Sequence, residues 1–214
     1  MQVHSGAMTT PTLVQTISTR RDAATWPIQA VSVLFITALT AAAAQVSVPL
    51  PFTAVPFTFQ PMVVLLGGLA LGSRLGTTSQ VLYLAAGIVG LPVFAASATL
   101  PPGALRLLGP TGGYLMAYPF AAFVVGYLAE RGFDRRYLTA VVAMLVGLAV
   151  VYACGVVWLG MFAHTATGNG AIGLQSAVIT GVLPFVLGDV AKLLLAASIV
   201  PVLWRIVGRT GQDV

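Results

Sequence analysis

Long apolar segments with almost no charge follow one another along most of this chain. The last of them, about 177–204, is long enough as a helix to cross the hydrocarbon core of a bilayer, which needs about 20 residues. Only 7% of the residues are charged and 58% are hydrophobic, whereas soluble domains carry about 25% charged residues. These helix-length runs predict an all-α integral membrane protein.

Six transmembrane helices are predicted from the apolar runs. Their approximate ranges are 28–46, 62–71, 75–89, 109–129, 138–162 and 177–204. The second run is too short to cross a bilayer unless it includes the flanking residues 57–61 and 72–73. The predicted organisation is a disordered cytoplasmic tail at 1–27, a six-helix transmembrane domain at 28–207, and a cytoplasmic tail at 208–214.

The basic residues are distributed unequally between the two sides that six helices would create. One arginine, Arg106, lies on the side opposite the termini. The arginines on the terminal side are Arg20, Arg21, Arg74, Arg131, Arg135, Arg136, Arg205 and Arg209. Because cytoplasmic loops of membrane proteins are enriched in Lys and Arg, both termini are expected in the cytoplasm. The net charge of +5 therefore marks topology and does not indicate nucleic-acid binding.

An acid and a base lie three residues apart inside the last apolar run. Asp189 is one of five acidic residues, and Lys192 is the chain's single lysine. On a helix, positions i and i+3 share a face. Ionisable groups within the membrane cost about 2.5–3.5 kcal/mol each on insertion scales and are functional by default. The pair therefore predicts a binding site, and the alternative is a structural ion pair that only orders the helices.

A proline-rich segment, 49–61, separates the first two predicted helices. Its four prolines exclude regular helix, yet the segment is apolar, aromatic and uncharged. We expect it to fold against the protein as a lid; a plain connector is the alternative.

The sequence Gly109-Pro110-Thr111-Gly112-Gly113-Tyr114 opens the fourth predicted helix. Its glycines expose backbone amides at a helix N-terminus, where anionic groups are favoured. No Gly-Lys-Ser/Thr follows, so this is not a phosphate-binding loop.

Other chemistry is weakly represented in the sequence. No second His or carboxylate lies near His164 at the spacing of metal ligands, and Cys154 is interpreted as a small core residue. Without an HExxH, a Gly-x-Ser-x-Gly or paired intramembrane carboxylates, we predict neither a metal site nor an enzyme. The chain lacks a Walker motif, so ATP-driven transport would need partner subunits. A stand-alone secondary carrier or channel for a small polar or anionic solute is the alternative function, although the two halves show no matching repeats.

Four motifs occur in a specific order. They are Pro-Leu-Pro-Phe-Thr (49–53) with Val-Pro-Phe-Thr-Phe-Gln (55–60), Leu-Tyr-Leu (82–84) with Gly-Leu-Pro-Val-Phe (90–94), Gly-Pro-Thr-Gly-Gly-Tyr (109–114), and Gly-Asp-x-x-Lys (188–192). In this combination the chain resembles BioY, the biotin-binding S component of energy-coupling-factor (ECF) vitamin transporters. The resemblance covers about residues 30–207.

The resemblance implies the S-component fold in a multi-pass protein of a prokaryotic cell membrane. Biotin would bind near the outer surface, and the partners would be a transmembrane T component and two ATP-binding-cassette ATPases. No cofactor is implied, because ATP would be used only by the partners. The resemblance also implies that Asp189 and Lys192 contact biotin and that residues 47–60 gate the site. Small residues of the first helix, Ala38 and Ala42, fit the spacing for docking to the T component, with other registers at 41–44.

The chemistry of biotin agrees with this assignment. Its ureido group presents two N–H donors and a C=O acceptor, so Asp189 can accept and Lys192 can donate. Alternatively, Lys192 binds the valerate carboxylate. The predicted ligand-binding residues are Asp189, Lys192, Phe52, Thr53, Phe57, Gln60, Tyr83, Thr111, Gly112 and Tyr114. No ligand contact is predicted from residues 95–108.

Overall fold

The computed structural model describes residues 10–13, 16, 25–97, 100–162 and 172–209. In chain order its elements are α2 (Thr25–Gln45), β1 (Ser47–Val48), β2 (Phe57–Thr58), α3 (Gln60–Ile88), α4 (Leu105–Leu108), α5 (Gly112–Leu128), the wide helical turn η1 (Ala129–Phe133), α6 (Tyr137–Met161), α7 (Leu174–Gly181), α8 (Leu183–Ala196) and α9 (Ile199–Arg209). The prediction of an all-α protein is confirmed, with one short exception. Strands β1 and β2 pair antiparallel over two residues each, Ser47 with Thr58 and Val48 with Phe57.

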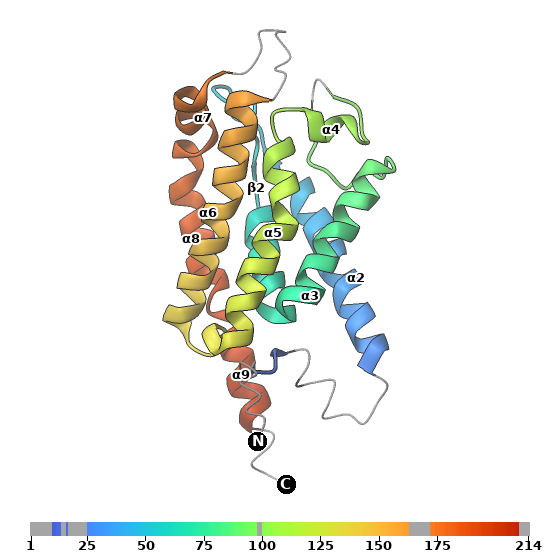
Figure 1. Ribbon diagram of the computed structural model, residues 1–214, viewed down its shortest axis with the longest axis vertical. Coiled ribbons are helices and arrows are strands. Elements are labelled where there is room, and N and C mark those ends of the chain that lie inside the picture. The colour runs from blue at the N-terminus through green and yellow to red at the C-terminus, as the bar shows by residue number, and fades with distance from the viewer. Residues whose placement is uncertain (1–9, 14–15, 17–24, 98–99, 163–171, 210–214) are drawn as a thin grey trace, which may run out of the picture.

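The helices run roughly along one long axis (Figure 1). Helix α5 packs between α3 and α6, α2 packs on α3, and α7 and α8 contact α6. The start of α2 and the end of α9 lie at the lower end of the molecule in Figure 1, whereas α4 and α7 lie at the upper end. We call the lower end the basic end and the upper end the α4 end.

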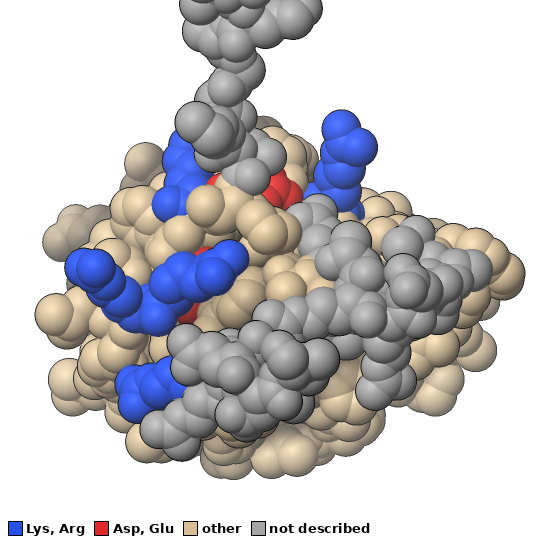
Figure 2. Space-filling view, turned by 90° about the horizontal axis from the view of Figure 1, so that it is seen from below, with Lys and Arg blue, Asp and Glu red and all other residues tan. Residues whose placement is uncertain are grey.

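Arginine side chains gather at the basic end, as Figure 2 shows for the view from below. The described residues concerned are Arg74, Arg131, Arg135, Arg136 and Arg205, all of them exposed. Arg106 lies in α4 at the opposite end. This distribution matches the unequal distribution of charge in the sequence. The cytoplasmic location of the basic end stays a prediction, and Arg20 and Arg21 lie outside the described residues.

Helix α3 is a hairpin of two helical arms. The break is at Gly72, whose φ of 85° and ψ of −180° are non-helical. A Cβ placed on Gly76 would lie 3.0 Å from the Cα of Gly68, although residues eight apart on a straight helix are separated by about 12 Å. The chain therefore folds back on itself, and Figure 1 shows α3 descending from β2 and then rising again. The second and third predicted helices are these two arms.

A carboxylate from η1 closes this bend. The Oε1 atom of Glu130 accepts hydrogen bonds from the backbone N–H and from the hydroxyl of Ser73, both at 2.8 Å. Ser73 begins the second arm of α3, where backbone N–H groups lack intrahelical partners and negative charge is favourable. Glu130 thus caps a helix to which it does not belong.

Five of the described helical segments are long and apolar enough to cross a membrane. They are Trp26–Gln45, Gln60–Ile88, Gly112–Phe133, Tyr137–Met161 and Leu183–Ile206. Because Gln60–Ile88 contains both arms of α3, the predicted number of six crossings stays a prediction. The last predicted helix is divided, since α7 ends at Gly181 and α8 begins with Pro184 in its first turn. Proline lacks the backbone N–H that a continuous helix would need there.

Small residues let the central helices approach closely, as is common in membrane bundles. A Cβ on Gly68 would lie 2.6 Å from the carbonyl oxygen of Ala122 in α5. Around this contact Leu65, Leu69 and Val125 are almost completely buried. Helix α2 is much less buried than the central helices, with 28% of its span inside the protein.

Part of the predicted N-terminal tail lies against the basic end. The backbone N–H of Thr10 donates to the carbonyl oxygen of Glu130 at 2.8 Å, and Arg135 donates to the carbonyl oxygen of Pro11 at 2.9 Å. Thr12 and Leu13 are buried. Most of the predicted tail 1–27, the end of the tail 208–214, and His164 lie outside the described residues.

Candidate functional site

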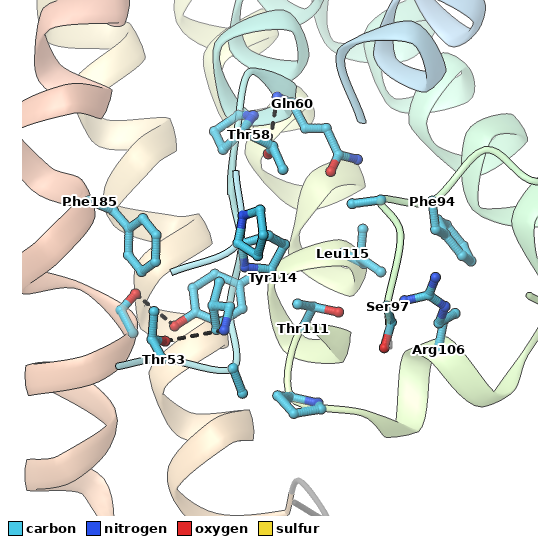
Figure 3. A pocket seen from close by; sticks show the side chains of 18 of the residues that line it. Thr53, Thr58, Gln60, Phe94, Ser97, Arg106, Thr111, Tyr114, Leu115 and Phe185 are labelled. Carbon is cyan, nitrogen blue, oxygen red and sulfur yellow. Dashed lines mark hydrogen bonds between the residues drawn. The ribbon is translucent and has the colours of Figure 1, made fainter. Parts of the chain in front are cut away.

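A cavity of about 300 Å³ opens near the α4 end between the proline-rich segment, the 93–100 connection and helices α5, α6 and α8. Its polar lining consists of Thr53, Thr58, Gln60, Ser97, Arg106, Thr111, Tyr114, Tyr118, Tyr152 and Asp189. Apolar side chains, among them Val55, Phe94, Leu115 and Phe185, form most of the remaining wall (Figure 3). Small-molecule sites have this character, with an apolar cavity and a few placed polar groups.

Asp189 lies at the wall of this cavity with both carboxylate oxygens engaged. Lys192, one helical turn later in α8, pairs with Oδ1 at 2.6 Å. The hydroxyl of Tyr152, from α6, donates to Oδ2 at 2.6 Å. Asp189 is 7% exposed, and a buried carboxylate needs such partners to offset its desolvation. Both Asp189 and Tyr152 line the cavity.

Lys192 also contacts the proline-rich segment. Its ammonium donates to the carbonyl oxygen of Thr58 in β2 at 2.6 Å. The same nitrogen lies 3.8 Å from the centre of the Phe57 ring and 5.1 Å from that of Phe59. Lys192 is not among the residues that line the cavity. That it contacts a ligand stays a prediction.

Arg106 brings a positive charge to the opposite side of the cavity. Figure 3 shows Arg106, together with Ser97, across the cavity from Phe185. Arg106 is buried, and among the described residues its Nε has no hydrogen-bond partner. Burial lowers the pKa of this guanidinium, because desolvation disfavours the charged form. A buried donor without a partner in the described part of the protein is available to a ligand group in the cavity.

Half of the residues predicted to bind ligand do line the cavity. They are Thr53, Gln60, Thr111, Tyr114 and Asp189. The Tyr114 hydroxyl donates to the carbonyl oxygen of Gly181 at 2.9 Å, which joins α5 to the end of α7. The structure therefore brings together predicted residues from three of the four motifs of the sequence.

The other predicted residues lie outside the lining. Phe52 is 60% exposed, and Gly112 is buried where a Cβ would approach Trp158 Nε1 to 2.9 Å. Phe57 stacks on Phe185 with ring centres 6.3 Å apart.

Tyr83, also outside the lining, is completely buried. It accepts a hydrogen bond from Gln60 Nε2 at 2.5 Å and donates to the carbonyl oxygen of Val93 at 3.2 Å. Its hydroxyl thus holds Gln60, which lines the cavity, and joins it to the backbone at Val93.

The two residues predicted to dock the T component, Ala38 and Ala42, are exposed on α2. They share this face with Val31, Leu34 and Phe35, whose side chains are 65%, 58% and 62% exposed. This face of α2 lies away from α3 and is accessible to another helix.

Sequence reasoning missed several cavity residues. Arg106 was interpreted only as a mark of topology, and no contact was predicted for residues 95–108, which contribute Ser97 and Arg106. Tyr152 was recognisable in the sequence, because it carries a hydroxyl in the middle of an otherwise apolar run. Phe94, Tyr118 and Phe185 had no signal that separates a cavity wall from an ordinary core position.

Comparison with known proteins gives one consistent result. The family model described as the BioY family matches residues 14–209. A probable biotin transporter BioY of Pyrococcus horikoshii is 41% identical over 177 residues, which cover 83% of this chain and 94% of the relative. The biotin transporter BioY of Thermotoga maritima is 38% identical over 163 residues, covering 76% of this chain and 88% of the relative.

A solved structure agrees with these relatives. It is the crystal structure, at 2.1 Å, of the S-component for biotin from an ECF-type ABC transporter. It is 29% identical to this chain, covers 83% of it and 90% of the solved chain, and superposes with a TM-score of 0.71. The relatives are named as transporters and not as enzymes. This multi-pass membrane protein belongs to the BioY family.

Proposed function

We propose that this protein binds biotin in the cavity near the α4 end, as the S component of an ECF-type importer, and performs no chemistry on it. The observation that carries the proposal is the cavity itself, which has a paired carboxylate, Asp189, in its wall and across from it a buried guanidinium, Arg106, whose Nε has no partner among the described residues. Biotin has hydrogen-bond donors at one end and a carboxylate at the other, so its chemistry is complementary to this arrangement.

Asp189 is the proposed acceptor for the ureido N–H groups. An ionised carboxylate has about four lone-pair sites, and Lys192 and Tyr152 use two of them. The carboxylate of Asp189 can therefore accept further hydrogen bonds from a ligand in the cavity. The two existing partners hold the carboxylate in one orientation before ligand arrives, which lowers the entropic cost of binding.

Arg106 is the proposed partner of the valerate carboxylate. Of the two cations near the site, Lys192 already contacts Asp189 and the Thr58 carbonyl oxygen, whereas Arg106 Nε has no partner among the described residues. A guanidinium also matches the planar carboxylate with two parallel N–H···O bonds. These observations favour Arg106 over the alternative in which Lys192 binds the valerate.

The apolar walls are proposed to enclose the bicyclic ring and the valerate chain. Val55 and Phe94 are 8% and 7% exposed, and Phe185 is 4% exposed, so each contributes nearly all of its surface to the interior. The volume of about 300 Å³ is at the lower end of the range for small-molecule sites, about 300–1,000 Å³. A single small vitamin suits this volume.

Transport is proposed to need a T component and two ATP-binding-cassette ATPases. The similarity to an S-component and the exposed face of α2 support this assembly. In the proposed orientation the basic end faces the cytoplasm of the cell, so the cavity near the α4 end receives biotin from outside.

Calorimetry with purified protein and two ligands tests the proposal. Biotin should bind to the unaltered protein, and Arg106→Gln should weaken that binding about 10- to 150-fold, the effect of losing a hydrogen bond to a charged group. Biotin methyl ester, which has no carboxylate charge, should bind both proteins with similar affinity.

Three outcomes would count against parts of the proposal. Absence of both binding heat and co-purified biotin would overturn the biotin assignment. Recovery of chemically altered biotin would overturn a pure binding role. Equal losses for biotin and its ester in Arg106→Gln would overturn the pairing of Arg106 with the carboxylate.

A further inference from the structure

The proline-rich segment forms one wall of the cavity. Pro49, Leu50, residues 53–56 and Thr58 line it, while Phe52 in this segment is 60% exposed and Val48, just before it, is 53% exposed. The segment therefore separates the cavity from the surroundings of the protein. The contacts that attach the segment to the helices therefore determine how readily the cavity opens.

The hydrogen bonds within this segment are mostly local. The Thr53 N–H donates to the carbonyl oxygen of Leu50 at 3.4 Å, and the Val55 N–H donates to the Thr53 hydroxyl at 3.1 Å. The ladder between β1 and β2 joins Phe57 and Thr58, near the end of the segment, to Val48 and Ser47, just before its start. These bonds shape the segment but do not attach it to the helices across the cavity.

Lys192 supplies an attachment to α8. Its ammonium donates to the carbonyl oxygen of Thr58, 134 residues away in the sequence, at 2.6 Å. It also lies 3.8 Å from the centre of the Phe57 ring, a cation–π contact that is stronger when desolvated. Beside these contacts, a Cβ on Gly188 would lie 2.7 Å from the Phe57 ring, so the glycine admits the ring against α8.

We propose that Lys192 is a positioning residue that fastens the segment 49–58 over the cavity, and that it does so in the absence of ligand. Because the same ammonium pairs with Asp189, which lines the cavity, a ligand that bonds to Asp189 acts on the ion pair that holds the segment. The role rests on the proposed function only in taking this cavity as the ligand site.

The attachment can be measured with two spin labels in ligand-free protein. Suitable positions are Val48, which pairs with Phe57 of β2, and Leu187 on α8; both are exposed and neither lines the cavity. In a Cys154→Ala background, pulsed spectroscopy of V48C/L187C should give one narrow distance distribution. Lys192→Met should broaden it, because the ratio of attached to detached segment falls about 10- to 150-fold when a charge-assisted hydrogen bond is lost.

Tyr152→Phe is the matched control. It removes the other hydrogen bond to Asp189, and among the described residues the Tyr152 hydroxyl makes no hydrogen bond to the segment 49–58. The distance distribution should therefore stay narrow. If the single variant Lys192→Met does not fold, the double variant Lys192→Met/Asp189→Asn leaves no unpaired buried charge and should broaden the distribution in the same way.

A narrow distribution in Lys192→Met, or in the double variant, would overturn the proposal. If biotin binding were lost while the distribution stayed narrow, Lys192 would be a ligand contact and the proposed function would stand. If the distribution broadened in a protein that never binds biotin, the attachment would stand and the proposed function would fall.

Discussion

The hydroxyl of Tyr152 donates a 2.6 Å hydrogen bond to Oδ2 of Asp189, which joins helix α6 to helix α8 at the wall of the cavity. In a buried site a hydrogen bond to a charged group contributes more than one between neutral groups. Tyr152→Phe should therefore weaken biotin binding about 10-fold, because Asp189 loses the donor that sets its orientation.

Calorimetry on Tyr152→Phe, Asp189→Asn and the double variant checks this explanation. If Tyr152 acts through Asp189, the two losses should be far from additive, as is found for residues in one network. Fully additive losses would mean that Tyr152 contacts the ligand independently.

The ion pair between Asp189 and Lys192 gives a second prediction. If the pair were only structural, removing both charges should be milder than removing one, since no unpaired buried charge would remain. We expect Asp189→Asn and Lys192→Met each to weaken biotin binding about 10- to 150-fold, and the double variant not to recover it. Restored affinity in the double variant, measured by calorimetry, would favour the structural alternative.

Docking to the T component is predicted to use the exposed face of α2. Where lipid provides no hydrophobic drive, small side chains allow close helix contacts. Ala38→Trp should block co-purification with the T component and leave biotin affinity unchanged. Ala149→Trp, on an exposed position of α6, is the control and should leave both co-purification and biotin affinity unchanged. If Ala42→Trp blocks assembly and Ala38→Trp does not, the docking face of α2 is correct but the contact residue is not. If assembly survives in both Ala38→Trp and Ala42→Trp, the docking hypothesis is wrong.

The bend in α3 should depend on Glu130. Glu130→Ala leaves the backbone N–H of Ser73 without the acceptor it has in the structure, which should cost about 1–3 kcal/mol and lower the melting temperature in detergent. Glu130→Gln keeps an acceptor oxygen, so its effect should be clearly smaller. Equal melting temperatures for Glu130→Ala and the unaltered protein would show that the carboxylate does not stabilise the bend.

Asp134 gives a prediction about pH at the basic end. It is completely buried, accepts from Trp204 Nε1 at 2.6 Å and pairs with Arg135 at 3.5 Å. Burial raises the pKa of the Asp134 carboxyl, and these bonds offset only part of the effect. At pH values between the unfolded and folded pKa of Asp134, the folded state binds more protons than the unfolded state. The contribution of protonated Asp134 to the free energy of unfolding is therefore present at low pH and is lost as the pH rises through the folded pKa.

Asp134→Asn keeps an acceptor for Trp204 and cannot ionise. The variant should therefore be the more stable protein near neutral pH, and its advantage should shrink as the pH falls to about 4. Melting curves of both proteins over this range measure the difference. A difference that does not change with pH would contradict the raised pKa.

Features that depend on local order in the chain were predictable from the sequence alone. Apolar runs of helical length determined the membrane class, since a chain with only 7% charged residues has too few for a soluble protein. The four prolines of 49–61 excluded a helix there, and helical periodicity placed Asp189 and Lys192 on one face. The order of four motifs was sufficient to indicate the BioY family, which the comparisons confirmed.

The tertiary structure decided which of these residues meet. Tyr152 reaches Asp189 across 37 residues of sequence and Lys192 reaches the Thr58 carbonyl across 134, and no local periodicity specifies such contacts. Arg106 became a cavity residue only because α4 packs where this side chain is buried in the cavity wall. The reason is physical: periodicity determines which face of a helix a side chain occupies, whereas the packing of helices and loops against one another determines what that face contacts.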